Sequence, residues 1–105
     1  MTSPEQEHLD YTGRMVIDDH QTNVGKITDV IFDPTSASPR WAIIRTNIFG
    51  REHVAPIDGS YLADDGRVVL AHPRVVVKQA PTAPRDHVLD DDLAAEASRH
   101  YGLAA

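Results

Sequence analysis

Cysteine is absent from the 105 residues of this chain, which excludes disulfides, thiolate nucleophiles and cysteine-ligated metals. A chain without cysteine suits a reducing compartment, and we expect a cytoplasmic location. Long apolar runs are also lacking, because segments such as Val68 to Ala71 are far too short to cross a bilayer. Residues 1–10 carry three acidic side chains and no apolar segment, so they match neither a signal peptide nor a membrane span.

Positive charge is scarce. Ten Lys and Arg residues stand against sixteen Asp and Glu residues, which gives a formal net charge of -6. A chain this acidic repels phosphate backbones on average and lacks the broad basic face used for non-specific binding of nucleic acid. A small basic patch on one side of the molecule is still compatible with this composition.

Sequence motifs for catalysis and for metal binding are lacking as well. No serine stands in a Gly-x-Ser-x-Gly motif and the carboxylates cluster in predicted turns, so we predict no enzyme. The six histidines show no His-x-x-x-His spacing, which favours scattered, solvated side chains over a metal site. The run Asp90 to Asp92 lacks the alternation of a calcium loop and fits a helix start. We therefore predict neither a metal nor a cofactor.

Short β-branched segments separated by polar turns make up the middle of the chain, as in a small barrel. In the second segment, the alternation of apolar and polar residues loses phase between Ile27 and Val30, which predicts a β-bulge. The four clearest predicted strands in this part are residues 15–17, 24–33, 41–46 and 52–56.

A hairpin and a helix are predicted in the second half. The turn Asp64-Asp65-Gly66 between residues 61–63 and 67–71 is the clearest hairpin signal of the sequence. After the proline-rich residues 80–84, three aspartates mark the start of a helix of about three turns that ends before Gly102. The sequence leaves open whether this helix packs on its own domain or on a neighbour's.

Six short motifs occur in a recognisable order along the chain, namely Val16-Ile17, Val24-Gly25-Lys26-Ile27, Pro39-Arg40-Trp41, Phe49-Gly50, Ala55-Pro56-Ile57 and Ala80-Pro81. Together they resemble the PRC-barrel domain, which the reaction-centre H subunit and the 30S ribosome-maturation factor share. The ending Arg99-His100-Tyr101-Gly102-Leu103 is similar to that of bacterial stand-alone or stress-linked members.

The resemblance implies a mainly β fold, a small closed antiparallel barrel with a short C-terminal α-helix. Residues 73–79 stay open between a strand, which three consecutive valines favour, and the short helical turn common in the family. The implied organisation is a flexible N-terminal tail at residues 1–10, a PRC-barrel domain at 11–81, and a linker with the helix at 82–105.

The resemblance also implies a non-enzymatic module for recognition and assembly. We expect a protein partner, which the sequence does not identify, and a homodimer. The alternative is contact with RNA or the ribosome, through a local basic patch beside Trp41 or Phe49. Its members would be Arg40, Arg45 and Arg51, with Lys26 as an additional one. The candidate binding residues are Arg40, Arg45, Ile48, Phe49, Arg51 and Tyr61.

Other residues are predicted to serve the fold. Trp41 has two interpretations, an exposed stacking platform or a core residue, and its apolar strand favours the core. A lone glycine such as Gly25 is expected to let a strand bend or another backbone approach closely, rather than to hold a phosphate. The predicted structural residues are Gly25, Trp41, Gly50, Pro56, Gly66 and Gly102.

Overall fold

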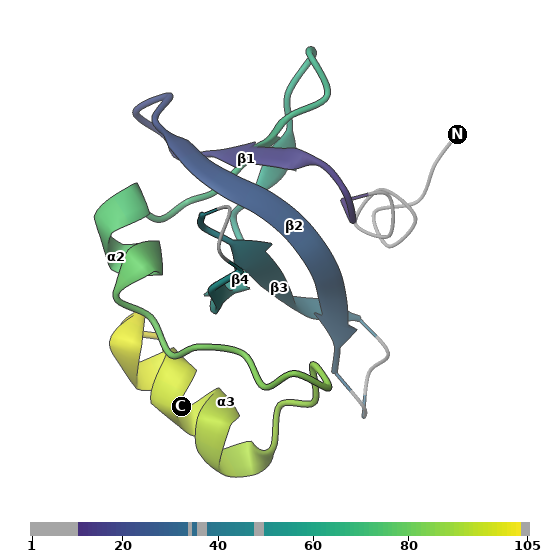
Figure 1. The fold of residues 1–105 in the computed structure, drawn as a ribbon, viewed down its shortest axis with the longest axis vertical. Coiled ribbons are helices and arrows are strands. Elements are labelled where there is room, and N and C mark those ends of the chain that lie inside the picture. Colours follow the sequence, from purple (N-terminus) through teal and green to yellow (C-terminus); the bar gives the residue numbers. More distant parts are fainter. Residues whose placement is uncertain (1–10, 34, 36–37, 48–49, 104–105) are drawn as a thin grey trace.

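A computed structural model describes residues 11–33, 35, 38–47 and 50–103 of the chain (Figure 1). The predicted tail at residues 1–10 and the candidate residues Ile48 and Phe49 lie outside the described residues. The elements are β1 (Met15–Ile17), β2 (Asn23–Phe32), β3 (Pro39–Arg45), β4 (Glu52–Pro56), β5 (Tyr61–Leu62), β6 (Val68–Val69), α2 (Arg74–Lys78) and α3 (Asp91–His100).

The strands form one six-stranded sheet in the order β4-β3-β2-β1-β6-β5. The mainly β fold with a C-terminal helix is thus confirmed, but a purely antiparallel sheet is wrong, because β1 and β6 pair in parallel. A tight turn can join two neighbouring strands only when they are antiparallel. Four strands lie between β1 and β6 in the sequence, so this pair is not joined by a tight turn and can be parallel. Within the described residues no ladder joins β4 to β5, so closure of the barrel stays a prediction.

The long strand β2 curves across the sheet and pairs with both β1 and β3 (Figure 1). Its register against β3 shifts between Ile27 and Asp29, which confirms the bulge predicted where the apolar alternation loses phase. A bulge bends a strand and increases its twist. The two halves of β2 can therefore serve different neighbours.

The core lies under the centre of the sheet. Strand β3 is buried from Trp41 to Ile44 and β4 from His53 to Pro56, so both strands are covered on their two faces. Burial of apolar area at about 25 cal/mol per Å² is the main favourable term for a domain of this size. The largest fully buried side chains are Tyr11, Ile27, Ile43, Ile44, Leu70, Val16, Val24, Val54, Val68 and Val77.

Residues 73–79 form a helix rather than a strand, which decides the question that the three valines left open. Only Val77 of α2 is buried. The helix start is held by Asp18, a 3 % exposed residue whose Oδ2 accepts from the amide of Arg74 at 3.0 Å. Burial opposes ionisation of Asp18, but its bonds from backbone amides outweigh burial, and its pKa is lowered.

The C-terminal helix α3 begins as predicted, with Asp90 as N-cap accepting from the amide of Leu93 at 2.8 Å. It packs on its own chain. The Tyr101 hydroxyl donates to the carbonyl oxygen of Val54 at 2.6 Å, and His100 Nε2 lies 2.7 Å from the carbonyl oxygen of Val76. The end of α3 therefore contacts α2, and the residue that follows the helix contacts β4, in the same molecule. In Figure 1, α3 lies next to α2.

Candidate functional site

A row of exposed side chains crosses the first three strands at the end of β3 where Arg45 lies. Met15 of β1 lies directly opposite Lys26 of β2, and Lys26 lies directly opposite Arg45 of β3. Directly paired residues project from the same face of a sheet. Lys26 and Arg45 are exposed, and Met15 is 44 % exposed. We call these three residues the cationic row.

The two cations of this row face each other, which destabilises a sheet when the charges are alike. Among the described residues, neither Lys26 nor Arg45 forms a salt bridge. Glu52 of β4 is paired with Arg45 on the side away from Lys26, but the carboxylate of Glu52 bonds to Thr28 and His87. The row thus carries positive charge that the fold itself does not neutralise by contact.

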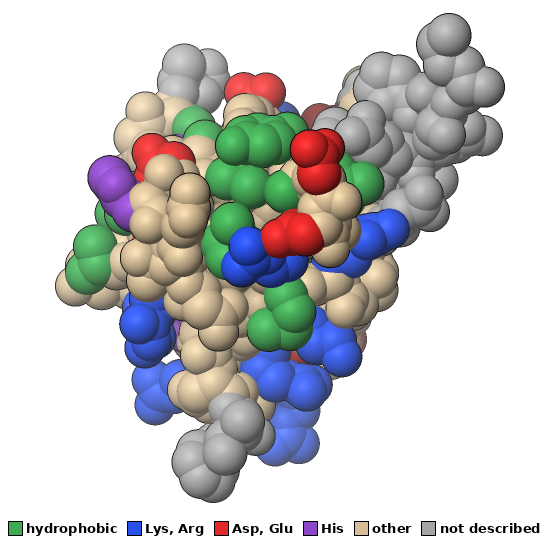
Figure 2. Space-filling view, turned by 90° about the horizontal axis from the view of Figure 1, so that it is seen from above, with side chains coloured by type: hydrophobic (Ala, Val, Ile, Leu, Met, Phe, Trp, Pro, Cys, Tyr) green, Lys and Arg blue, Asp and Glu red, His purple; other side chains and the backbone are tan. Residues whose placement is uncertain are grey.

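A shallow hollow of about 370 Å³ lies over the cationic row. Figure 2 shows charge segregated on the molecule: most Lys and Arg side chains in this view lie in its lower half, and most Asp and Glu side chains in its upper half. The net charge of -6 is therefore unevenly distributed. The residues lining this cationic hollow are Met15, Asn23, Gly25, Lys26, Arg45, Thr46 and Asn47.

Gly25 forms part of the floor of this hollow. A Cβ built on Gly25 would lie 2.9 Å from the carbonyl carbon of Arg45, and closer still to the carbonyl oxygen. Strands β2 and β3 therefore lie so close together at this point that no residue with a side chain fits at position 25 without a shift of the backbone. This approach brings Lys26 and Arg45 into the same row.

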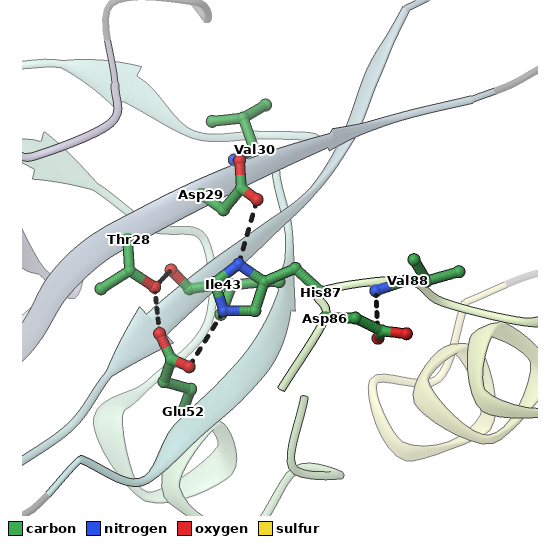
Figure 3. Close-up of polar contacts among 8 residues, drawn as sticks. All are labelled: Thr28, Asp29, Val30, Ile43, Glu52, Asp86, His87 and Val88. Atoms are coloured by element: carbon green, nitrogen blue, oxygen red, sulfur yellow. Dashed lines mark hydrogen bonds and ion pairs between the residues drawn. The ribbon is translucent and has the colours of Figure 1, made fainter. Parts of the chain in front are cut away.

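A second polar cluster lies on the segment that leads to α3. The ring of His87 sits between two carboxylates, with Nδ1 3.0 Å from Asp29 Oδ2 and Nε2 3.0 Å from Glu52 Oε1 (Figure 3). Glu52 also accepts from the hydroxyl of Thr28. His87 has a φ of 57°, a left-handed conformation that is uncommon outside glycine and asparagine. These contacts fasten the segment before α3 to β2 and β4.

The surroundings of this cluster favour a charged imidazole. The hydrogen bond to Glu52 raises the pKa of His87 above its usual value of 6.5. Burial of the ring opposes this shift, and the hydrogen bond to Asp29 adds to it. Burial raises the pKa of Glu52, but two other effects outweigh it, and the net pKa is lowered. These effects are the hydrogen bonds from Thr28 and His87 and the positive charges of His87 and Arg45. Two N–H donors then serve two carboxylates, which a neutral ring cannot do.

Replacing His87 with asparagine tests this cluster, because asparagine tolerates the left-handed backbone. A raised pKa in the folded state contributes stability below pH 6.5 and loses it as the pH rises through the folded value. We expect His87→Asn to lower the free energy of unfolding by about 1.5–3 kcal/mol at pH 5.5 and by less at pH 8.5. Urea denaturation at both pH values measures this difference.

The matched control is His20→Asn, because the side chain of His20 is 72 % exposed and its ion pair with Asp19, at 3.6 Å, is on the surface. That variant is expected to stay within about 0.5 kcal/mol of the wild type at both pH values. An equal loss from His87→Asn at pH 5.5 and pH 8.5 would show that the charge on the ring has no part in fastening the segment.

The His87 cluster is not arranged as a metal site. Its two carboxylates bind opposite edges of the ring, so they cannot converge on one ion with an imidazole nitrogen. Elsewhere in the described residues, no group of three or more potential ligands is placed to hold a metal ion. Solvated histidines were expected, and this is wrong for His53, which is 5 % exposed and bonds Ala80 through Nδ1 at 2.8 Å.

The predicted basic residues do not form one patch. Arg40 lies at the other end of β3 from Arg45, 3.5 Å from Asp33, with its guanidinium carbon 5.7 Å from the ring centroid of Trp41. Trp41 itself is 2 % exposed, so its ring is unavailable for stacking on a base. Arg51 is exposed in a neighbouring hollow with Glu52, Thr82 and Arg85.

The remaining candidates have separate places. Tyr61 is 58 % exposed on the edge strand β5, far along the sheet order from Arg45. Pro56 is buried opposite Trp41. Gly50, Gly66 and Gly102 have positive φ angles of 89°, 89° and 69°, and an added Cβ at Gly66 would lie 3.2 Å from Nη1 of Arg14.

The His87 cluster had no signal in the sequence. Its partners Asp29 and Glu52 lie 58 and 35 positions away, and no short motif joins residues so distant. The pairing of Lys26 with Arg45 was equally invisible, because it depends on the register of two strands. Both features come from tertiary structure.

The strand order, the bulge in β2 and the close approach of β3 to Gly25 define a small β-rich module. The chain belongs to the PRC-barrel family, because the family's PRC-barrel domain matches residues 9–77. The resemblance noted in the sequence motifs is thereby confirmed. No curated protein matches the chain. Among the described residues, no helix has the length and apolar character that crossing a bilayer requires.

Proposed function

We propose that this chain is a non-enzymatic module that binds another protein through the exposed residues that β1, β2 and β3 present side by side. The observation that carries the proposal is the cationic row, an exposed set of one apolar and two charged side chains on regular strands. Rigid elements position binding side chains better than loops do. Charges left without a partner in the fold are available for one outside it.

The strand edges offer less to a partner than these exposed residues do. Residues 81–83 cover the edge of β4, since Val54 donates to the carbonyl of Pro81 at 3.2 Å and Ala83 donates to Glu52 at 2.8 Å. The opposite edge strand, β5, has two residues. Short or covered edges limit pairing with another chain. Side-chain recognition by these residues is therefore favoured over strand addition.

Self-association is part of the proposal, with a symmetric dimer as the default arrangement. A two-fold axis through the cationic row would bring like charges together, which costs energy. Tyr61, 58 % exposed at the β5 edge, is the better centre for such a dimer. Aromatic side chains with a polar tip are common in protein interfaces.

RNA contact is the second candidate function. Lys26 and Arg45, which form no salt bridge within the described residues, favour it, because cations that release phosphate counterions drive such binding. Two cations on an acidic protein supply little of this term, and the buried Trp41 supplies no stacking platform. Protein binding is therefore the stronger proposal.

Affinity capture from a native lysate, with and without ribonuclease, separates the two functions. We expect the same protein partners to be retained after ribonuclease treatment, because apolar and carboxylate contacts do not depend on RNA.

Light scattering of the purified chain is expected to give a dimer mass that Tyr61→Lys lowers to that of a monomer. Loss of every partner on ribonuclease treatment, together with a strictly monomeric mass, would contradict the proposal.

A further inference from the structure

We propose that the cationic hollow binds an acidic peptide segment of a partner protein, with two carboxylates that pair with Lys26 and Arg45. This inference rests on the proposed function and names the chemistry of its partner. The hollow of about 370 Å³ is at the small end of ligand sites in proteins, which suits a few side chains of an extended segment.

The positive charge of the hollow favours an acidic ligand. Lys26 and Arg45 face each other across β2 and β3, and neither forms a salt bridge within the described residues. An anion placed between them turns a repulsive pair into two attractive contacts. The planar guanidinium of Arg45 can hold a carboxylate through two parallel hydrogen bonds, and the ammonium of Lys26 acts as a point charge.

The other lining groups fit a peptide. Asn23 and Thr46 also line the hollow, and side-chain amides and hydroxyls are groups that bond to a peptide backbone. Met15 is 44 % exposed beside Lys26, and its flexible thioether adapts to apolar side chains of different shape. A mixed apolar and cationic lining favours a segment that carries both acidic and apolar residues.

A nucleic acid fits this hollow less well. Among the described residues, two cations line the hollow. The whole chain carries a net charge of -6, which repels a long polyanion. No aromatic residue is among those that line the hollow in the described part of the chain. A short peptide needs only the local charges, because its own charge is small and screened beyond about 10 Å.

The test is a binding titration of the full chain with a synthetic decapeptide of alternating aspartate and leucine, followed by amide chemical shifts. A peptide with asparagine in place of aspartate, a ten-nucleotide uridine RNA and inorganic phosphate serve as comparison probes. We expect the acidic peptide to shift the amides of Lys26 and Arg45, with an affinity that falls as salt rises.

The double variant Lys26→Gln/Arg45→Gln is expected to weaken peptide binding at least about tenfold, because two charge-assisted contacts are lost. Its matched control is Lys78→Gln/Arg99→Gln, which removes one lysine and one arginine from exposed positions on α2 and α3. The control is expected to bind as the wild type does. Without peptide, the double variant should melt close to the wild type, because relief of the like-charge pair offsets the lost attraction between Arg45 and Glu52.

Four results would overturn the inference. Equal binding of the asparagine peptide would show that the carboxylates are not recognised, and tighter binding of the RNA would assign the hollow to nucleic acid. Phosphate binding as tightly as the peptide would reduce it to a small-anion site. Shifts at Lys26 and Arg45 that grow with protein concentration alone would assign it to a second copy. In each case, ribonuclease-resistant capture of a protein through other exposed residues of β1, β2 and β3 would leave the proposed function standing.

Discussion

Replacing Gly25 with alanine is expected to destabilise the protein by about 3 kcal/mol or more. The new Cβ would lie 2.9 Å from the carbonyl carbon of Arg45, and nearer to its oxygen. These are backbone atoms in the ladder between β2 and β3, so they cannot move aside without breaking hydrogen bonds. A φ of 155° adds strain for any residue with a side chain. Urea denaturation followed by circular dichroism measures the loss.

Gly13→Ala is the matched control for this substitution. Gly13 has a φ of 89°, but nothing lies within 4 Å of a Cβ built there. That variant should therefore lose only the backbone contribution of a left-handed residue, about 1–2 kcal/mol. If both variants lose the same stability, the close approach of Gly25 to Arg45 does not matter for the fold. The difference between them isolates the clash from the strain.

Replacing Trp41 with alanine is expected to lower the free energy of unfolding by about 3–5 kcal/mol. The indole is 2 % exposed and lies opposite Pro56, so the variant leaves a cavity in the best-covered part of the sheet. Total stabilities of domains are about 5–15 kcal/mol, so this loss removes a large share. Thermal unfolding measures it, and a variant that melts as the wild type does would contradict a core role for Trp41.

Two further variants frame this prediction. Trp41→Phe keeps an aromatic ring in the same place and should lose clearly less than the alanine variant. Tyr61→Ala removes an aromatic residue that is 58 % exposed and should stay within about 0.5 kcal/mol of the wild type. An equal loss from Tyr61→Ala would mean that Tyr61 supports the fold rather than a dimer surface.

Several elements could be predicted because their signals are local. The bulge of β2 follows from the lost alternation between Ile27 and Val30, and the start of α3 follows from Asp90 three positions before Leu93. In both cases the residues that decide the conformation lie within a few positions of each other. The parallel pairing of β1 with β6 has no such signal, since Val16 and Val68 are 52 positions apart.

The candidate site could be predicted only in part. The sequence shows which residues are cationic, but it does not show which of them share a face. Arg40 and Arg45 are separated by an odd number of positions on β3, so they project from opposite faces as well as from opposite ends. Lys26 joins Arg45 instead, because the register of β2 against β3 places them side by side.

The sequence by itself determined the family, the turns, the caps and the bulge, because each depends on neighbouring residues or on motifs in fixed order. Only the tertiary structure decided that Lys26 faces Arg45, that His87 lies between Asp29 and Glu52, and that the C-terminal helix packs on its own chain. The physical reason is that strand register and long-range packing choose among partners that local chemistry leaves equivalent.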